Sequence, residues 1–251
     1  MNTVAILLGR KGSKGLPGKN TMQLLGRPIL HYPLLAATHS KYVDSIYVTT
    51  DDPEIAREAQ DFEVELIDRP AYLCTDAALF EDALVHAYTE VKIRTGKVPD
   101  YIVVLMCNAP TIDAEMIDAA IESLEADKEA DSAVTVTCLN MYSPLRARRL
   151  NDHGYLDPFV PFESFGDPAT LNCDRDSQGD SYFADMSHSV TRAECLENLA
   201  EGLLPQRWMG QKILPVYNTF GCDIDASWQV AVSVNWLQER GYEEGKTPYD
   251  D

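Results

Sequence analysis

The stretch TVAILLGRKGSKGLPGKN, residues 3–20, decides the expected fold. It begins with a nearly continuous apolar run, of the kind found in a buried parallel strand, and Gly9 ends that run. Open α/β sheets bind ligands at the carboxyl ends of their strands. Glycines at every third position, from Gly9 to Gly18, let backbone N–H groups approach a ligand without interference from a Cβ atom. The sequence therefore predicts a binding loop at the end of a central strand.

The charge of this loop indicates its ligand. Arg10, Lys11, Lys14 and Lys19 lie among the glycines, although the 251-residue chain has a formal net charge of -19 and no acidic residue before Asp44. Such a chain would repel the long phosphate backbone of nucleic acid, so we expect no nucleic-acid partner. A short phosphate chain, partly neutralised by a metal ion, needs only one basic loop. A nucleoside triphosphate fits best, and a solvent-exposed surface loop is the alternative.

Two common phosphate loops do not match. A Walker loop needs a glycine five residues before Gly18 and a Ser or Thr after Lys19, where this chain has Ser13 and Asn20. A dinucleotide fingerprint needs two glycines separated by one residue, and this loop has none. The sequence thus gives no support for a P-loop or for a nicotinamide or flavin cofactor.

Composition predicts one globular domain spanning residues 1–251, with 45% hydrophobic and 24% charged residues. No apolar run reaches the roughly 18 residues of a membrane span, and the N-terminus lacks the features of a secretory signal. The six cysteines contain no C-x-x-C pair, which is typical of reduced, structural thiols. We expect a cytoplasmic protein with no membrane partner.

Segments rich in β-branched residues alternate with helical patterns along the chain. The expected strands are Val4–Leu8, Ser45–Thr49, Glu63–Ile67, Tyr101–Met106, Ser132–Thr137 and Lys212–Tyr217. The expected helices are Pro28–Thr38, Pro53–Asp61 with Asp52 as its cap, Ala78–Arg94, Ala114–Glu125, Arg192–Glu201 and Ala226–Glu239. This alternation predicts an α/β fold, with a mostly parallel, Rossmann-like nucleotide-binding sheet covered by helices on both faces.

Residues 139–190 interrupt the alternation, because they combine several prolines and aromatic residues with no clean period. A structureless loop of this length is improbable in a compact domain, and the aromatic side chains need a surface to pack on. We expect an inserted arm of short strands that closes over the site or docks on a second subunit.

A second chemical signal is Asp223-Ile224-Asp225, which follows an apolar segment. Carboxylates two residues apart on an extended chain project to one face, and two such oxygen ligands can share a Mg²⁺ ion with phosphate oxygens. The alternative is that Asp225 caps the following helix. A triphosphate favours the metal, because a cation polarises the phosphate under attack.

Several motifs, in the correct order over residues 3–240, resemble the acylneuraminate cytidylyltransferases, or CMP-sialic acid synthetases, and the related CMP-3-deoxy-manno-octulosonate synthetases. The most specific is Arg10-x-Gly-Ser-Lys-Gly-Leu-Pro-x-Lys-Asn20, which resembles their signature loop. Val48-Thr-Thr-Asp-Asp-x-Glu-Ile-Ala56 is similar to their second-strand motif, Arg69-Pro-x-x-Leu-x-Thr-Asp76 to their pyrimidine-contacting segment, and Asp223-Ile-Asp225 to their metal-binding aspartates.

This resemblance implies a reaction in which the hydroxyl of a 2-keto sugar acid attacks the α-phosphorus of CTP and releases pyrophosphate. It implies that Mg²⁺ binds Asp223 and Asp225 and that Arg10, Lys14 and Lys19 stabilise phosphate charge. Arg69 and Thr75 would help to select cytosine. The further substrate-binding residues implied are Gly12, Ser13, Asn20, Asp76, Asn108, Arg175 and Tyr182.

The acceptor half of the family pattern is altered. The family's L-Q-P-T-S-P-L-R becomes L-M-C-N-A-P-T-I over residues 105–112, without the Gln and the Arg. The later R-Q-D-x-P-x-x-Y-x-x-N-G keeps its Arg-to-Tyr spacing as Arg175 and Tyr182 but ends in Asp185-Met186. Arg175 is the candidate contact for an acceptor carboxylate, with a surface ion pair as its alternative. The resemblance also implies a homodimer whose arm reaches the partner's site.

Three other functions fit parts of the pattern. A sugar-1-phosphate nucleotidyltransferase would use a similar sheet and loop, and a glycosyltransferase could use Asp223-Ile224-Asp225 with a nucleotide sugar. A non-catalytic nucleotide-binding homologue is the third.

Overall fold

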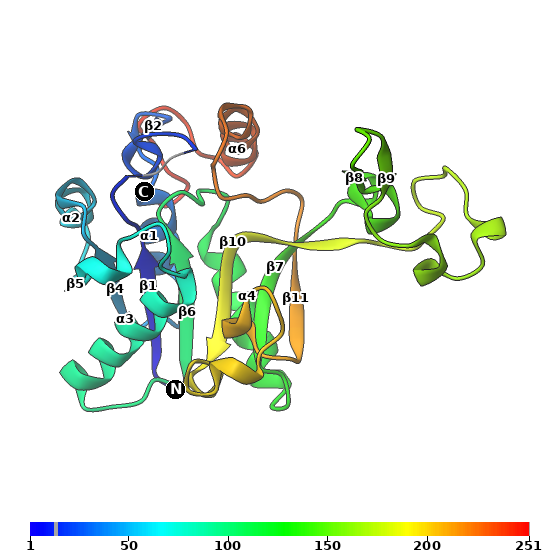
Figure 1. Cartoon of the computed structure of the whole chain (residues 1–251). Helices are drawn as coiled ribbons and strands as arrows, with labels where there is room; N and C mark the ends of the chain where they lie inside the picture. Colours follow the sequence, from blue (N-terminus) through cyan, green and yellow to red (C-terminus); the bar gives the residue numbers. More distant parts are fainter. Residues whose placement is uncertain (13–14, 251) are drawn as a thin grey trace.

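A computed structural model describes residues 1–12 and 15–250, and its centre is a seven-stranded sheet (Figure 1). The sheet has the order β11-β7-β10-β6-β1-β4-β5. Its strands are β1 (Thr3–Leu8), β4 (Ser45–Thr50), β5 (Glu65–Asp68), β6 (Tyr101–Met106), β7 (Ser132–Cys138), β10 (Tyr182–Arg192) and β11 (Ile213–Asn218). All neighbours pair in parallel except β10, which runs antiparallel to both β6 and β7. The expected mostly parallel sheet is confirmed.

Helices cover both faces of this sheet, as expected. They are α1 (His31–His39), α2 (Pro53–Ala59), α3 (Phe80–Thr95), α4 (Ala114–Ala126), α5 (Ala193–Glu197) and α6 (Ser227–Glu239). Buried residues of α1, α2 and α4 pack on one face, and those of α3 and α5 pack on the other. A third apolar cluster joins α6 to the hairpin of β2 (Gln23–Leu24) and β3 (Arg27–Pro28) and to α1. Within residues 1–12 and 15–250, no helix combines the length and apolarity needed to cross a membrane.

The expected elements agree with the observed ones except at their ends. Each of the six expected strands forms, with bounds that shift by at most two residues. Asp52 caps α2 as predicted, because its carboxylate accepts a hydrogen bond from the Glu54 N–H at 2.9 Å. The first expected helix starts later, since Pro28 belongs to β3, and the expected helix at 192–201 breaks at Asn198 into α5 and a 3-10 turn, Leu199–Glu201.

The sequence interpretation missed β10, which lies between β6 and β7 in the sheet. Residues 182–190 were expected to belong to the inserted arm, but they form most of this strand. Its pairing with β7 shifts in register between Ala184 and Ser189, where Met186 has a φ of 62°. A left-handed backbone conformation is costly for a residue with a Cβ atom. At Met186 it accompanies an irregularity in the strand, which a regular strand pattern does not predict.

The inserted arm is therefore residues 139–181, which leave the end of β7 and return at the start of β10. Figure 1 shows this segment projecting to one side of the sheet. It contains one hairpin of β8 (Arg148–Leu150) and β9 (Leu156–Pro158), together with several 3-10 turns. The expected short strands are thus present.

Candidate active site

A cavity of about 380 Å³ opens where β1 and β6 end. The glycine-rich loop, the segment after β5, the start of α3 and the Asp223–Asp225 segment surround it. Its lining includes the expected site residues Arg10, Lys19, Asn20, Arg69, Asn108, Asp223 and Asp225. Segments far apart in sequence therefore meet at the carboxyl edge of the sheet, as the strand-loop pattern predicts.

Hydrogen bonds hold the described part of the loop against its surroundings. The Arg10 guanidinium donates to the Cys74 carbonyl at 3.2 Å and to the Asp76 carboxylate at 3.1 Å. The Asn20 amide donates to the Arg10 carbonyl at 3.0 Å. The backbone N–H of Lys11 donates to the Asp51 carboxylate at 2.8 Å. Asp76 thus lies next to the loop as an Arg10 partner.

Two glycines of the loop are closely packed. A Cβ atom on Gly9 would lie 2.4 Å from the Cys107 sulfur and 2.8 Å from Ile55, so any side chain there would force these two side chains to move. A Cβ on Gly15 would lie 3.1 Å from the Asp225 carbonyl. Gly12 has a φ of 82° and is exposed, and it is absent from the cavity lining. The predicted site residues Ser13 and Lys14 lie outside the described residues.

Asn108 fixes the position of the aspartate pair. Its backbone carbonyl accepts a hydrogen bond from the Ile224 N–H at 2.8 Å, and its side-chain amide donates to the Ile224 carbonyl at 3.1 Å. Ile224 itself is fully buried. This double contact places the side chains on either side of Ile224 at the cavity, since neighbours of an inward residue on extended chain point the other way.

The two aspartates have different surroundings. Asp225 is exposed and forms an ion pair with Lys19. Asp223 is half-buried, and burial together with the negative charge of Asp225 raises the pKa of its carboxyl, although Lys19 opposes this effect. A cation between the two would offset both the burial cost and the repulsion. Two carboxylates also form the oxygen-only donor set that Mg²⁺ prefers, so these residues fit the expected metal.

The capping alternative for Asp225 is wrong, because the N-cap of α6 is Ala226. Gln229 organises this turn instead. Its side-chain oxygen accepts hydrogen bonds from the N–H groups of Asp225 at 2.8 Å and Ala226 at 2.7 Å, and its amide donates to the Asp223 carbonyl at 3.1 Å. Sequence reasoning missed Gln229, although a Gln three residues after a helix N-cap is a known capping signal.

Arg69 contributes a half-buried positive charge. Its guanidinium donates to the Thr49 carbonyl at 2.8 Å and lines the cavity next to Leu73. Burial lowers the pKa of Arg69, yet an arginine keeps its charge in proteins. The position at the cavity is compatible with the expected contact with the cytosine base, which stays a prediction.

Three predicted substrate residues lie elsewhere in the single chain. The Thr75 hydroxyl donates to the Tyr72 carbonyl at 3.4 Å and lines a neighbouring groove along α3, because its segment turns at Leu73. Arg175 is exposed on the arm and pairs with Asp176 at 3.3 Å. Tyr182 lies at the base of the arm, where its ring packs edge-on against Tyr217. The structure does not bring these three residues to the cavity.

The cavity also has an apolar side that the sequence interpretation did not assign. Leu79, Phe80 and Ala83 at the start of α3 line it together with Met106 at the end of β6. Met106 was noted only as a departure from the family pattern. No motif marks the start of α3 in the sequence, so only its place in the fold reveals that it lines the cavity.

Comparison with known proteins agrees with this geometry. Residues 4–153 match the family model of the cytidylyltransferases. The chain is 31% identical over 158 residues to the N-acylneuraminate cytidylyltransferase of Escherichia coli O18:K1:H7, a match covering 62% of this chain and 36% of that protein. It is 27% identical to the CMP-N,N'-diacetyllegionaminic acid synthase of Legionella pneumophila, covering 62% of this chain and 66% of that protein. The chain thus spans about a third to two thirds of these curated relatives.

Solved structures extend the likeness of the fold to the whole chain. A CMP:2-keto-3-deoxy-manno-octonic acid synthetase complexed with CTP superimposes with a TM-score of 0.66 at 19% identity, covering 95% of this chain and all of that one. A 4-diphosphocytidyl-2C-methyl-D-erythritol synthase from Anaerococcus prevotii gives a TM-score of 0.61 at 14% identity, covering 94% and 96%. The family model, which matches more than half of the chain, and the cavity at the strand ends lead to one conclusion: this chain belongs to the cytidylyltransferase family.

Proposed function

We propose that this protein transfers CMP from CTP to the hydroxyl of a 2-keto sugar acid, releasing pyrophosphate. The observation that carries the proposal is the meeting of Arg10, Lys19 and Arg69 with Asp223 and Asp225 around one cavity. Three cations suit a triphosphate, and two carboxylates suit its metal. The nucleotide and acidic sugar acceptor come from the family and from the activities in the names of the relatives.

The residues act mainly by positioning and charge stabilisation, which dominate phosphoryl transfer. Arg10 and Lys19 hold the phosphates while the acceptor hydroxyl oxygen bonds to the α-phosphorus and loses its proton to water. The bond from the α-phosphorus to the oxygen that bridges to the β-phosphate breaks. Lys19 then faces the charge that develops on the leaving pyrophosphate. Lys14 belongs to the same loop and would add a further cation. Asn20 fixes the loop through the Arg10 carbonyl.

Asp223 and Asp225 would hold a Mg²⁺ ion, which, when bound, supplies positive charge that polarises the phosphate under attack. Gln229 and Asn108 orient the two carboxylates through backbone contacts. Lys19 forms an ion pair with Asp225, so the loop cation and a carboxylate that would hold the ion lie side by side at the cavity.

The acceptor is proposed as a nonulosonate related to sialic acid. The apolar surface of Leu79, Phe80 and Met106 offers contact to the carbon skeleton or acyl groups of such a sugar, because apolar groups prefer apolar neighbours. The test is a pyrophosphate-release screen that crosses four nucleotides with a panel of 2-keto sugar acids. A product with one phosphorus supports the proposal. A product with two phosphorus atoms identifies a sugar-1-phosphate nucleotidyltransferase, and CTP binding without release identifies a non-catalytic homologue.

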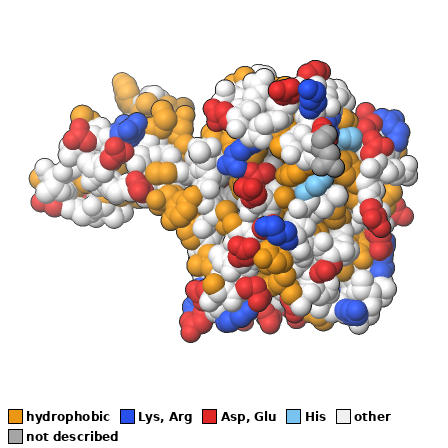
Figure 2. Space-filling view, turned by 180° about the vertical axis from the view of Figure 1, so that it is seen from behind, with side chains coloured by type: hydrophobic (Ala, Val, Ile, Leu, Met, Phe, Trp, Pro, Cys, Tyr) orange, Lys and Arg blue, Asp and Glu red, His pale blue; other side chains and the backbone are white. Residues whose placement is uncertain are grey.

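We also propose that the active form is a homodimer in which the arm covers the partner's acceptor site. The arm exposes large apolar side chains, including Leu150 at 70%, Tyr155 at 72% and Phe159 at 60%. Figure 2 shows hydrophobic side chains gathered on the arm and at its junction with the body. Such a surface marks an interaction site. Exchange of arms would bring Arg175 and Tyr182 to a cavity that they do not reach in their own chain.

The proposed location is the cytoplasm. All six cysteines lie within the described residues and are free thiols, as is usual in a reducing compartment. Separation of cell fractions followed by immunodetection tests this location.

A further inference from the structure

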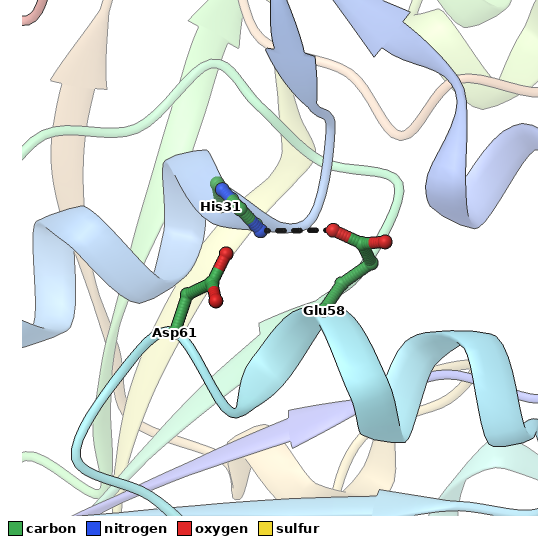
Figure 3. Close-up of side chains that lie close together, drawn as sticks. All are labelled: His31, Glu58 and Asp61. Atoms are coloured by element: carbon green, nitrogen blue, oxygen red, sulfur yellow. Dashed lines mark ion pairs between the residues drawn. The ribbon is translucent and has the colours of Figure 1, made fainter.

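A cluster of metal-binding side chains lies between α1 and α2, outside the cavity of the proposed reaction. His31 is the first residue of α1, Glu58 lies in the last turn of α2, and Asp61 follows that helix. One ligand atom from each residue lies within 4.8 Å of the other two. Figure 3 shows that both carboxylates face the His31 ring from the α2 side.

His31 has a buried nitrogen without a hydrogen-bond partner. Its side chain is only 9% exposed, and its Nε2 atom has no hydrogen bond to any described residue. The nearest ion-pair partner is the Glu58 carboxylate, at 3.7 Å. An unpaired buried polar atom costs free energy comparable to a lost hydrogen bond, so a ligand that bonds to this nitrogen would remove that cost.

A simple His–carboxylate ion pair does not explain the arrangement, because the Glu58 oxygen lies 3.7 Å from the His31 Nε2 atom, beyond hydrogen-bond distance. A ring nitrogen of a neutral histidine is a common metal ligand. The edge-on contact of the ring with Phe62, with centroids 5.0 Å apart, holds its orientation.

We propose that His31, Glu58 and Asp61 bind a divalent first-row transition-metal ion such as Zn²⁺, distinct from the Mg²⁺ of the proposed reaction. Zinc binds His nitrogen and carboxylate oxygen at about 2.0–2.2 Å, in tetrahedral sites, which places neighbouring ligand atoms roughly 3.4 Å apart. The 3.7 Å from Nε2 to the Glu58 oxygen is close to that spacing. The exposed Asp61 carboxylate closes the site by a side-chain movement, and water completes it.

A metal at this position would tie α1 to α2. The same α2 packs under the nucleotide loop, because its residue Ile55 limits the space at Gly9. The N-cap of α2, Asp52, directly follows Asp51, whose carboxylate accepts a hydrogen bond from the Lys11 N–H. The ion would therefore stabilise the support of the loop without touching substrate. Its role is structural, and its binding does not depend on the proposed reaction.

The test is a titration of the chelator-treated full chain with Zn²⁺, followed by calorimetry and by thermal unfolding. Excess Mg²⁺ is present throughout, so that it occupies Asp223 and Asp225. Asp61→Asn removes a ligand from an exposed position, so its fold should persist. Glu63→Gln is the matched control, because it removes an exposed carboxylate two residues away that lies outside the cluster.

The wild type and Glu63→Gln should bind one Zn²⁺ with equal affinity, and Tm should rise with its concentration. The Zn²⁺ affinity of Asp61→Asn should fall by at least roughly 10- to 100-fold. A loss of that size is typical even when a residue that only hydrogen-bonds a metal ligand is removed. Equal affinity in Asp61→Asn and Glu63→Gln, or a wild type that neither binds Zn²⁺ nor gains in Tm, would overturn the proposal. Zn²⁺ binding in the wild type that survives Asp61→Asn would place the ion elsewhere.

Discussion

The cavity end of the sheet and the arm differ in how deeply their side chains are buried and in where their hydrogen-bond partners lie. At the cavity, Leu8, Gly9 and Asn108 are buried, and the polar groups are held by contacts from the chain itself. On the arm, Leu150 and Tyr155 are mostly exposed, and the hydrogen bonds are largely local. The body is therefore complete within one chain, whereas the arm lacks a surface to cover it.

This difference separates the two substrates of the proposed reaction. Arg10, Lys19 and Arg69 already line one cavity, so we expect the proposed CTP binding to require no second copy. Arg175 and Tyr182 belong to the arm and its base, so their proposed contact with the acceptor requires a partner. Variants that act on one region should leave the other region unaffected.

The largest effect is expected at the metal site of the body. Asp225→Asn removes one of two carboxylates proposed to hold Mg²⁺ and should reduce turnover by about 10³-fold or more. Excess chelator should do the same to the wild type. Pyrophosphate release and thermal unfolding check this prediction together. An active, metal-independent Asp225→Asn enzyme would refute the metal assignment.

The phosphate loop should give the next largest effect. Arg10→Ala removes a cation that faces the cavity and should lower turnover roughly 10²-fold, since charge stabilisation is lost in the transition state. The matched control is Lys128→Ala, which removes an exposed cation paired with Glu125 after the end of α4. Normal turnover in Arg10→Ala with unchanged Tm would show that the loop does not bind the phosphates.

Shortening the arm between Pro144 and Pro168 should convert a dimer into a folded monomer. Turnover should fall about tenfold or more because the acceptor is no longer positioned, while CTP affinity should stay within about twofold of wild type, as the cavity is intact. Light scattering, CTP titration and pyrophosphate release measure the three effects. A truncated protein that remains dimeric would break the proposed contrast between body and arm.

A pair of point variants sharpens this test. Leu150 on the arm and Ile93 on α3 are equally exposed apolar residues, at 70% and 69%. Leu150→Glu should weaken the dimer, since it introduces a charge into the proposed interface, and Ile93→Glu should not. Equal dimer dissociation constants for the two variants would exclude the arm as the interface.

The last prediction concerns stability instead of turnover, namely the pH dependence of the free energy of unfolding of the body. His188 lies in the buried half of β10, where burial lowers its pKa from 6.5 to about 4. The unfolded chain binds the proton more tightly, so the free energy of unfolding should fall as pH drops from about 6.5 to about 4. The total loss should be on the order of 3 kcal/mol.

Urea unfolding at several pH values, compared between wild type and His188→Leu, measures this contribution. The variant should lack this component of the pH dependence, and the arm-shortened protein should keep it, because His188 belongs to the body. Parallel pH profiles for wild type and His188→Leu would show that His188 is not titrated during unfolding.

Local sequence patterns determined most of the parallel core. The apolar run before Gly9 predicted β1, and β-branched segments predicted six strands, since burial on both faces selects such residues. Asp52 could be predicted as a cap because a side chain and the N–H two residues later interact within one turn. The loop cations and Asp223-Ile224-Asp225 could be identified because their charges stand out from their neighbours.

Tertiary structure alone decided the place of β10, because its buried polar side chains find partners far along the chain. Ser187 hydrogen-bonds the Thr111 hydroxyl at 2.9 Å, and Ser189 accepts from the Trp208 indole at 3.1 Å. Such a strand looks too polar for a core until those partners are known. Tertiary packing also explains why the sequence predicted Thr75 at the cavity and did not predict Phe80 there. The direction of a side chain depends on packing that no local pattern records, whereas charge and apolar periodicity are properties of the sequence itself.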